Sequence, residues 1–228
     1  MEKDKKYYIF ELNLKTLNIS AILVAIILIV LTQLFGVNIL EYLINSNINI
    51  ILLFVIMFLY LALHEILHSI GYVIHGAKFK NIVYGIALEK GVFYCLCKQN
   101  ISRKNILYTS MYPLFFIGII TYIIGTIFNL PLLVILSIIN ISGSTGDIFT
   151  FLYIIKLKDI SFSEIDDETA FAIYSAQDVS KVKHFGLKYI KCVPNIERKD
   201  LKKVKISKAS YIVLAVILVL LLLDLILK

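Results

Sequence analysis

The feature that most constrains this chain is a stretch of 42 residues, at positions 105–146, that contains no charged side chain. A helix that crosses a membrane needs about 20 mainly apolar residues, so this stretch can hold two such helices joined by a turn near Pro131. Across the chain, 59% of the residues are hydrophobic and 17% are charged, whereas soluble domains have about 25% charged residues. These values exclude an ordinary soluble domain and indicate an integral membrane protein.

Further apolar runs complete the expected architecture, which is an all-α polytopic membrane protein with five transmembrane helices. The expected spans are residues 17–37, 48–74, 106–128, 130–155 and 210–228. β-Branched and aromatic residues on both sides of Glu89-Lys90-Gly91 predict a small cytoplasmic β-hairpin after the second span. We expect a membrane-embedded core at residues 1–158, a cytoplasmic segment at 159–209 and a C-terminal helix at 210–228. The cytoplasmic segment fits a lid, a recognition element or a solvated linker.

The distribution of basic residues predicts the orientation in the membrane. Of the 23 Lys and Arg residues, 22 fall on one side if the spans alternate in direction. Basic residues are retained in the cytoplasm, so the N-terminus is expected there and the C-terminus outside. The net charge of +7 then reflects topology, and no basic module or stacking motif indicates nucleic-acid binding. We expect a cell membrane, bacterial from the Lys/Ile/Asn-rich composition, with the lipid bilayer as a partner and the three cysteines reduced.

The second expected span carries the sequence His64-Glu65-Ile66-Leu67-His68, which matches the pattern HExxH. Histidines four residues apart project from one face of a helix, so their ring nitrogens can bind a single zinc ion. The intervening glutamate then lies beside the water that the zinc activates. Ionisable residues at membrane depth are costly and mark candidate functional sites. The alternative is a buried helix whose histidines only form hydrogen bonds to neighbours.

Catalytic zinc sites usually have three protein ligands, and the candidates for the third are His75, Glu89, Asp147 and His184. His75 follows His68 by seven residues, which does not fit the shorter spacing of HExxHxxGxxH. Glu89 and His184 belong to polar segments. Asp147 lies 17 residues into the fourth span and His64 lies 16 residues into the second, so both reach a depth of about 24 Å. We therefore expect Asp147 to be the third ligand.

The residues before Asp147 are small and polar in an otherwise bulky apolar helix. Gly143 and Gly146 would let this helix bend, or approach the second span closely. Asn140 precedes Asp147 by seven residues and shares about the same helix face. Its amide could hold a substrate backbone or form a hydrogen bond between helices.

The HEILH motif and the later residues 140–147 (NISGSTGD) resemble the membrane-embedded zinc peptidases of the site-2 protease-like group. They are more similar to a smaller family of zincin membrane peptidases, over roughly residues 61–158. This resemblance implies that His64, His68 and Asp147 bind zinc and that Glu65 is the catalytic base. In site-2 proteases a glycine follows the aspartate, whereas here Gly146 precedes Asp147. The resemblance therefore extends to the zinc site and not to the substrate or pathway.

Zinc lowers the pKa of its bound water towards 7, and Glu65 can accept the proton as the water attacks a carbonyl. The sequence therefore predicts a zinc metalloendopeptidase that cleaves a membrane-associated protein or peptide near the cytoplasmic face. A strand of the hairpin could hold this substrate in extended form, or the hairpin could only close the fold. The alternative functions are a catalytically inactive, zinc-stabilised membrane-binding protein and a metal transporter, which would need polar ligands at several depths.

Overall fold

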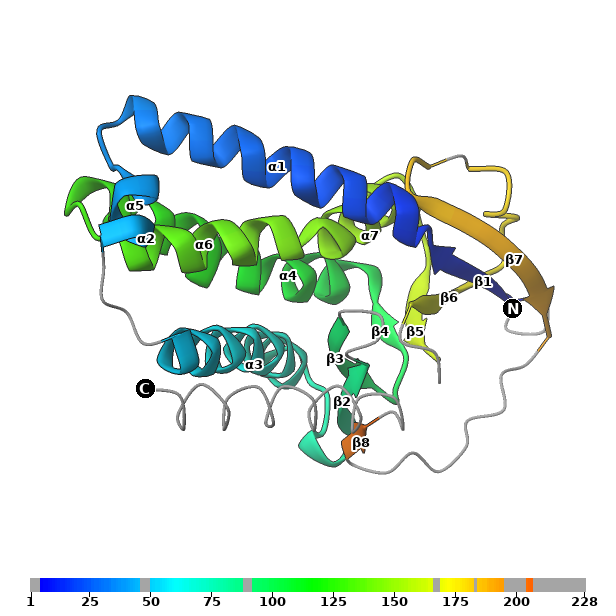
Figure 1. The fold of residues 1–228 in the computed structure, drawn as a ribbon. Coiled ribbons are helices and arrows are strands. Elements are labelled where there is room, and N and C mark those ends of the chain that lie inside the picture. The colour runs from blue at the N-terminus through cyan, green and yellow to red at the C-terminus, as the bar shows by residue number, and fades with distance from the viewer. Residues whose placement is uncertain are drawn as a thin grey trace.

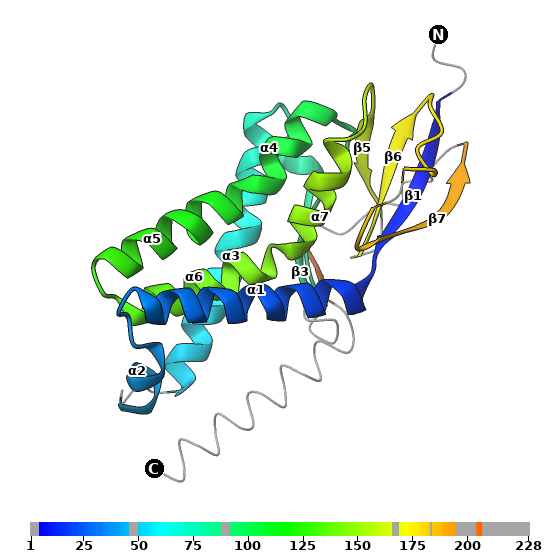
Figure 2. The same cartoon turned by 90° about the horizontal axis from the view of Figure 1, so that it is seen from above.

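Long apolar helices lie side by side in this computed structural model, and the strands gather at one end of them (Figures 1 and 2). The structure describes residues 5–45, 50–87, 92–165, 169–182, 184–194 and 204–206. The helices are α1 (Leu14–Leu34), α2 (Ile39–Asn45), α3 (Ile50–Ile74), η1 (Phe79–Asn81), α4 (Arg103–Pro113), η3 (Leu114–Ile119), α5 (Ile120–Ile127), α6 (Pro131–Gly143) and α7 (Thr145–Ile154). The strands are β1 (Lys6–Leu12), β2 (Ile82–Ala87), β3 (Val92–Cys97), β4 (Ile101–Ser102), β5 (Ser161–Glu164), β6 (Ala170–Ser175), β7 (Leu187–Val193) and β8 (Val204–Ile206).

Three helical segments among the described residues are long and apolar enough to cross a membrane, which is compatible with a membrane protein. They are α1, Leu52–Ile74 of α3, and the helix Arg103–Ile127 that α4, η3 and α5 form together. The pair α6 and α7 is bent by 43° and makes a fourth candidate if both helices form one span. The expected fifth span, residues 210–228, lies outside the described residues. Within the described residues, three or four candidate spans thus correspond to the four that were expected there.

The expectation of an all-α fold is wrong, because the described residues include eight strands that form two sheets. One sheet is antiparallel and has the strand order β4-β5-β6-β1-β7. β1, from the N-terminal tail, lies between β6 and β7, and the aromatic rings of Phe10 on β1 and Phe171 on β6 stack with centroids 5.9 Å apart. Alternating buried and exposed residues allow a strand to bury one face while the other remains polar. Residues 1–15 were expected to be a polar tail and residues 159–209 a lid, a recognition element or a linker, and the strands that both contribute to this sheet were not predicted.

The second sheet has the order β3-β2-β8 and lies beside α3. Strands β2 and β3 are antiparallel and flank residues 88–91, where the hairpin was expected. β8 pairs with the other edge of β2 in a parallel arrangement, so this unit is more than an isolated hairpin. β3 and β8 are the two edge strands of this sheet, and β3 packs against α3.

Candidate metal centre

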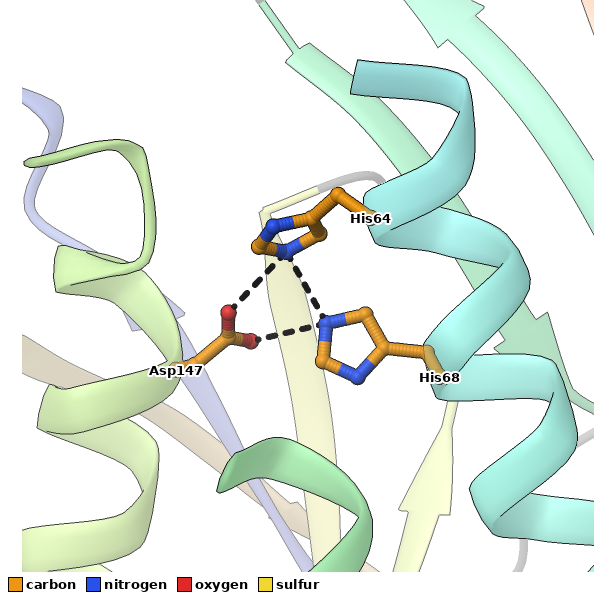
Figure 3. A group of neighbouring side chains, drawn as sticks. All are labelled: His64, His68 and Asp147. Carbon is orange, nitrogen blue, oxygen red and sulfur yellow. Dashed lines mark hydrogen bonds and ion pairs between the residues drawn. The ribbon is translucent and has the colours of Figure 1, made fainter. Parts of the chain in front are cut away.

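Three potential metal ligands converge from two helices (Figure 3). Successive turns of α3 present His64 and His68, and the first turn of α7 presents Asp147. The two Nε2 atoms are 3.2 Å apart, and they lie 3.3 Å and 3.4 Å from the Asp147 carboxylate oxygens Oδ2 and Oδ1. Both histidines are buried, while the Asp147 side chain is 24% exposed. The structure thus brings together the three residues that the sequence nominated as ligands.

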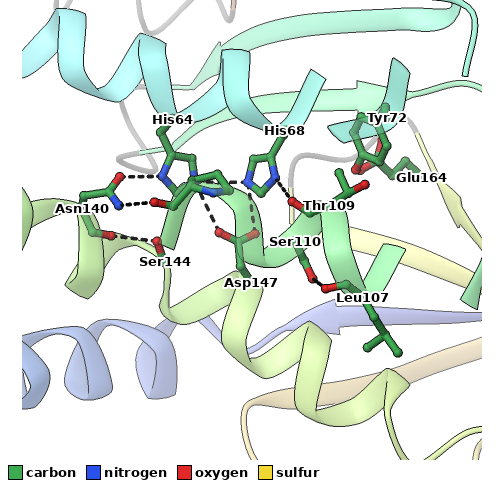
Figure 4. Close-up of polar contacts among 11 residues, drawn as sticks. His64, His68, Tyr72, Leu107, Thr109, Ser110, Asn140, Ser144, Asp147 and Glu164 are labelled. Carbon is green, nitrogen blue, oxygen red and sulfur yellow. Dashed lines mark hydrogen bonds and ion pairs between the residues drawn. The ribbon is translucent and has the colours of Figure 1, made fainter. Parts of the chain in front are cut away.

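Each imidazole is oriented by an acceptor on its far side (Figure 4). His64 Nδ1 lies 2.8 Å from Asn140 Oδ1, and His68 Nδ1 lies 3.0 Å from the backbone oxygen of Thr109. The side-chain amide of Asn140 is itself fixed because its Nδ2 donates to the Pro113 carbonyl at 3.1 Å. Both acceptors are oxygens without a proton, so each histidine donates from Nδ1. The neutral rings therefore direct their Nε2 lone pairs at each other and at Asp147.

The acceptor for His68 exists because of Pro113. In an α-helix the carbonyl of residue 109 would accept the N–H of residue 113, but proline has no N–H. The Thr109 carbonyl is therefore left for His68. Gly71, one turn later on α3, permits this close approach, since a Cβ there would lie 3.0 Å from the Thr109 side chain. The backbone of α4 thus serves both histidines, one directly and the other through Asn140.

The donor set and its spacing fit a zinc ion. Two imidazole nitrogens and a carboxylate are ordinary zinc ligands, and tetrahedral bonds of roughly 2.0–2.1 Å separate neighbouring ligand atoms by about 3.3 Å. The three observed separations are 3.2, 3.3 and 3.4 Å. Two lone pairs and a carboxylate at such distances repel each other unless a cation lies between them. His64, His68 and Asp147 would hold that cation.

The bend between α6 and α7 brings Asp147 to this point. The helix changes direction at Ser144, whose backbone N–H and hydroxyl both donate to the Asn140 carbonyl, at 2.9 and 2.8 Å. Of the two roles considered for Asn140, the structure shows the hydrogen bond between helices. A Cβ on Gly146 would meet Leu17 of α1, and one on Gly143 would meet nothing within 4 Å. The expected role of these glycines in an approach to α3 is therefore not seen.

The other candidate ligands do not join this cluster. His75 follows the end of α3, where its ring stacks on Tyr108 and its Nε2 lies 3.4 Å from the Tyr112 hydroxyl. His184 lies between β6 and β7 and contacts the rings of Phe149 and Tyr153. Glu89 lies outside the described residues. Asp147 is thus the candidate that the structure places beside both histidines.

A cavity of about 350 Å³ opens beside the three ligands. Glu65, between the two histidines, lines it, and the backbone N–H of Cys95 donates to the Glu65 carboxylate. The walls come from α1, α3, α6, α7 and the sheets, with β3 contributing residues 93–96. The cavity therefore brings the metal ligands, Glu65 and residues of β3 together in one space.

Glu164, at the end of β5, is a cavity residue that the sequence analysis did not single out. Its Oε1 accepts a hydrogen bond of 2.7 Å from the Tyr72 hydroxyl, and its Oε2 accepts one from the Cys97 backbone N–H. Burial raises the pKa of Glu164 to about 7 although both donors lower it. The sequence carries only a weak signal for this role of Glu164. The residue shares a strand face with the buried Phe162, which is an unusual place for a carboxylate.

Residues 57–162 match the model of a protein family described as "Putative zincin peptidase". The match contains the HExxH motif, the Pro113 region and Asp147. Comparisons with curated proteins and with solved structures found no match.

Proposed function

We propose, from the match of residues 57–162 to the family described as "Putative zincin peptidase", that the chain is a membrane-embedded zinc metalloendopeptidase. The proposal depends most on one observation. Both histidines are held by acceptors at Nδ1, and their Nε2 atoms meet the Asp147 carboxylate at separations of 3.2–3.4 Å. Such an arrangement satisfies the ligand set of a catalytic zinc, with three protein ligands and one position left for water.

The chemistry divides between the metal and Glu65. Zinc, when bound, supplies a Lewis acid that makes water a nucleophile near neutral pH and polarises the substrate carbonyl. The Glu65 carboxylate takes the proton from the attacking water and passes it to the leaving amine. The Cys95 N–H that donates to this carboxylate orients it within the cavity. Throughout the reaction His64 and His68 keep their Nδ1 protons, which they donate in hydrogen bonds to Asn140 Oδ1 and to the Thr109 carbonyl.

The substrate class follows from the position of the cavity. Its lining includes Leu17 and Ala21 of α1, which is a candidate membrane span, and also residues of both sheets at the end of the helices. A substrate that reaches this cavity is therefore a membrane-associated protein or peptide, cut near the boundary that we expect to face the cytoplasm. Proteases need an extended substrate, because a helix hides its peptide bonds in its own hydrogen bonds.

The change Glu65→Gln tests the catalytic assignment. Glutamine keeps the size of the side chain but cannot accept the proton, so we expect unchanged zinc content and a rate of peptide cleavage about 10²–10⁴-fold lower. Zinc is measured by elemental analysis of the purified full chain, and cleavage by mass spectrometry of a peptide library. Equal cleavage by both proteins would overturn the proposed mechanism. A chain that binds zinc but cleaves nothing in either form would instead be the zinc-stabilised binding protein.

The change Asp147→Ala tests the metal assignment separately. It removes one of three ligands, so we expect the purified protein to lose most of its zinc. The matched control is Asp178→Ala, which removes an exposed carboxylate that contacts Ser180 and Lys181 within its own loop. Equal zinc content in both variants would exclude Asp147 as a ligand.

A further inference from the structure

We propose that Glu164 selects substrates that carry a cationic group, namely a Lys or Arg side chain or a free N-terminal amine, next to the cleaved bond. This inference rests on the proposed peptidase function and assigns its substrate preference. Glu164 lies outside the segment that matches the family, on β5, and it lines the same cavity as Glu65 and the three ligands.

The carboxylate of Glu164 is held in place with acceptor capacity to spare. Tyr72 donates to one oxygen and the Cys97 N–H to the other. A carboxylate has about four acceptor positions, so roughly two remain for a ligand. Both donors are neutral, so they fix the orientation of the group without balancing its charge. An ammonium or guanidinium group from a substrate would supply that balance.

The charge of the whole cavity favours a cation as well. Its described lining contains three carboxylates, Glu65, Asp147 and Glu164, and no Lys or Arg. A divalent metal held by Asp147 and two neutral histidines leaves one positive charge, which Glu65 offsets. Glu164 is the carboxylate in excess: burial opposes its charged form, and a bound cation would favour that form. Charge complementarity of this kind discriminates strongly between cationic and neutral partners in a partly buried site.

The position of Glu164 limits which substrate residue it can reach. Tyr72, its hydrogen-bond donor, follows His68 by four residues on α3, which is about 6 Å along the helix axis. An extended peptide advances about 3.3 Å per residue. The cationic group therefore belongs within about two residues of the cleaved bond.

The test begins with the unmodified full chain, loaded with zinc, and a peptide library made by cleavage after Glu, which leaves Lys and Arg inside the peptides. We expect Lys and Arg to be enriched within two residues of the cut sites. The best substrate is then compared with a copy in which norleucine, an uncharged analogue, replaces its Lys. We expect kcat/KM to fall about 30-fold or more. N-terminally acetylated copies distinguish a side chain from an N-terminal amine.

Variants then assign the preference to Glu164. In Glu164→Gln the Lys and norleucine peptides should be cut within about threefold of each other, while Glu164→Asp should keep part of the preference. The control Glu41→Gln removes one carboxylate on α2, at the opposite end of the molecule (Figure 1), and should keep all of it. Binding to Glu65→Gln, measured by fluorescence anisotropy, should show the same preference without turnover.

The outcomes separate the two proposals. Cleavage that depends on Glu65 but treats Lys and norleucine alike, or a preference that survives in Glu164→Gln, overturns the role of Glu164 and leaves the peptidase intact. Absence of cleavage by the unmodified chain overturns the proposed function, and the substrate preference with it.

Discussion

At the scale of single residues, Glu164 is a carboxyl group whose ionisation the fold opposes. Burial is the largest cause and raises its pKa from 4.5 to about 7, with Asp147 adding to the rise. Tyr72, the Cys97 amide and His68 favour the charged form and lower the pKa. The folded chain therefore keeps this proton at pH values where the unfolded chain has released it.

This difference predicts a pH-dependent stability. Between about pH 4.5 and 7 only the folded state retains the proton, so the free energy of unfolding falls as the pH rises, and it is level above about 7. We expect Tm of the unmodified chain, relative to Glu164→Gln, to decrease over this range by roughly 2–4 °C for each kcal/mol lost. Thermal unfolding of both zinc-loaded proteins in the same detergent, from pH 4.5 to 8, measures it. A Tm difference independent of pH would contradict the assignment.

At the scale of elements, the break that Pro113 makes in the helix Arg103–Ile127 supports the metal centre. The missing N–H frees the Thr109 carbonyl for His68, and the Pro113 carbonyl itself fixes Asn140, the partner of His64. Residues that orient metal ligands in this way typically change metal affinity 10–100-fold when they are altered. The proline thus weakens the helix and strengthens the site.

The change Pro113→Ala should separate these two effects. The new N–H competes with His68 for the Thr109 carbonyl, so we expect zinc affinity to fall about 10-fold. The metal-free protein should be equally or more stable, because a proline inside a helix costs about 3 kcal/mol. Competition with a zinc chelator and thermal unfolding measure the two quantities. Pro131→Ala, at the start of α6 where no helical N–H is lost, should leave zinc affinity unchanged; an equal loss in both variants would refute this role of Pro113.

The elements also show what the sequence could and could not predict. The apolar runs located α1, α3, α6 and α7, because a helix at membrane depth must exclude charge over about 20 residues. The HExxH spacing and the matched depth in the membrane depend on helix geometry alone, and they predicted His64, His68 and Asp147 as the ligands. β1 was not found, since its pairing with β6 and β7 joins segments more than 150 residues apart. The acceptor at Thr109 is a backbone carbonyl, which every residue has, so the sequence could not predict its role.

At the scale of the whole molecule, the large sheet constrains how the chain can cross a membrane. β1 precedes the first candidate span, and β5, β6 and β7 follow the last one described. Because β1 pairs directly with β6 and β7, both parts must lie on one side. An even number of crossings achieves this, so we infer that the bent pair α6 and α7 forms a fourth span beside the three candidates. We expect this side to be the cytoplasmic one, because basic residues are retained there.

Thiol labelling of whole cells tests this arrangement. Cys192 on β7 is exposed at the sheet end, and Phe128, after α5, is exposed at the opposite end of the helices (Figures 1 and 2). A membrane-impermeant maleimide should label Cys192 only after permeabilisation. It should label Phe128→Cys, in a Cys192→Ser background, in intact cells. The reverse labelling pattern would show that the chain has the opposite orientation in the membrane. Labelling of both sites in intact cells would mean that the chain crosses the membrane an odd number of times between β1 and β7, or not at all. The pairing of β1 with β7 excludes an odd number, and the proposed embedding excludes none.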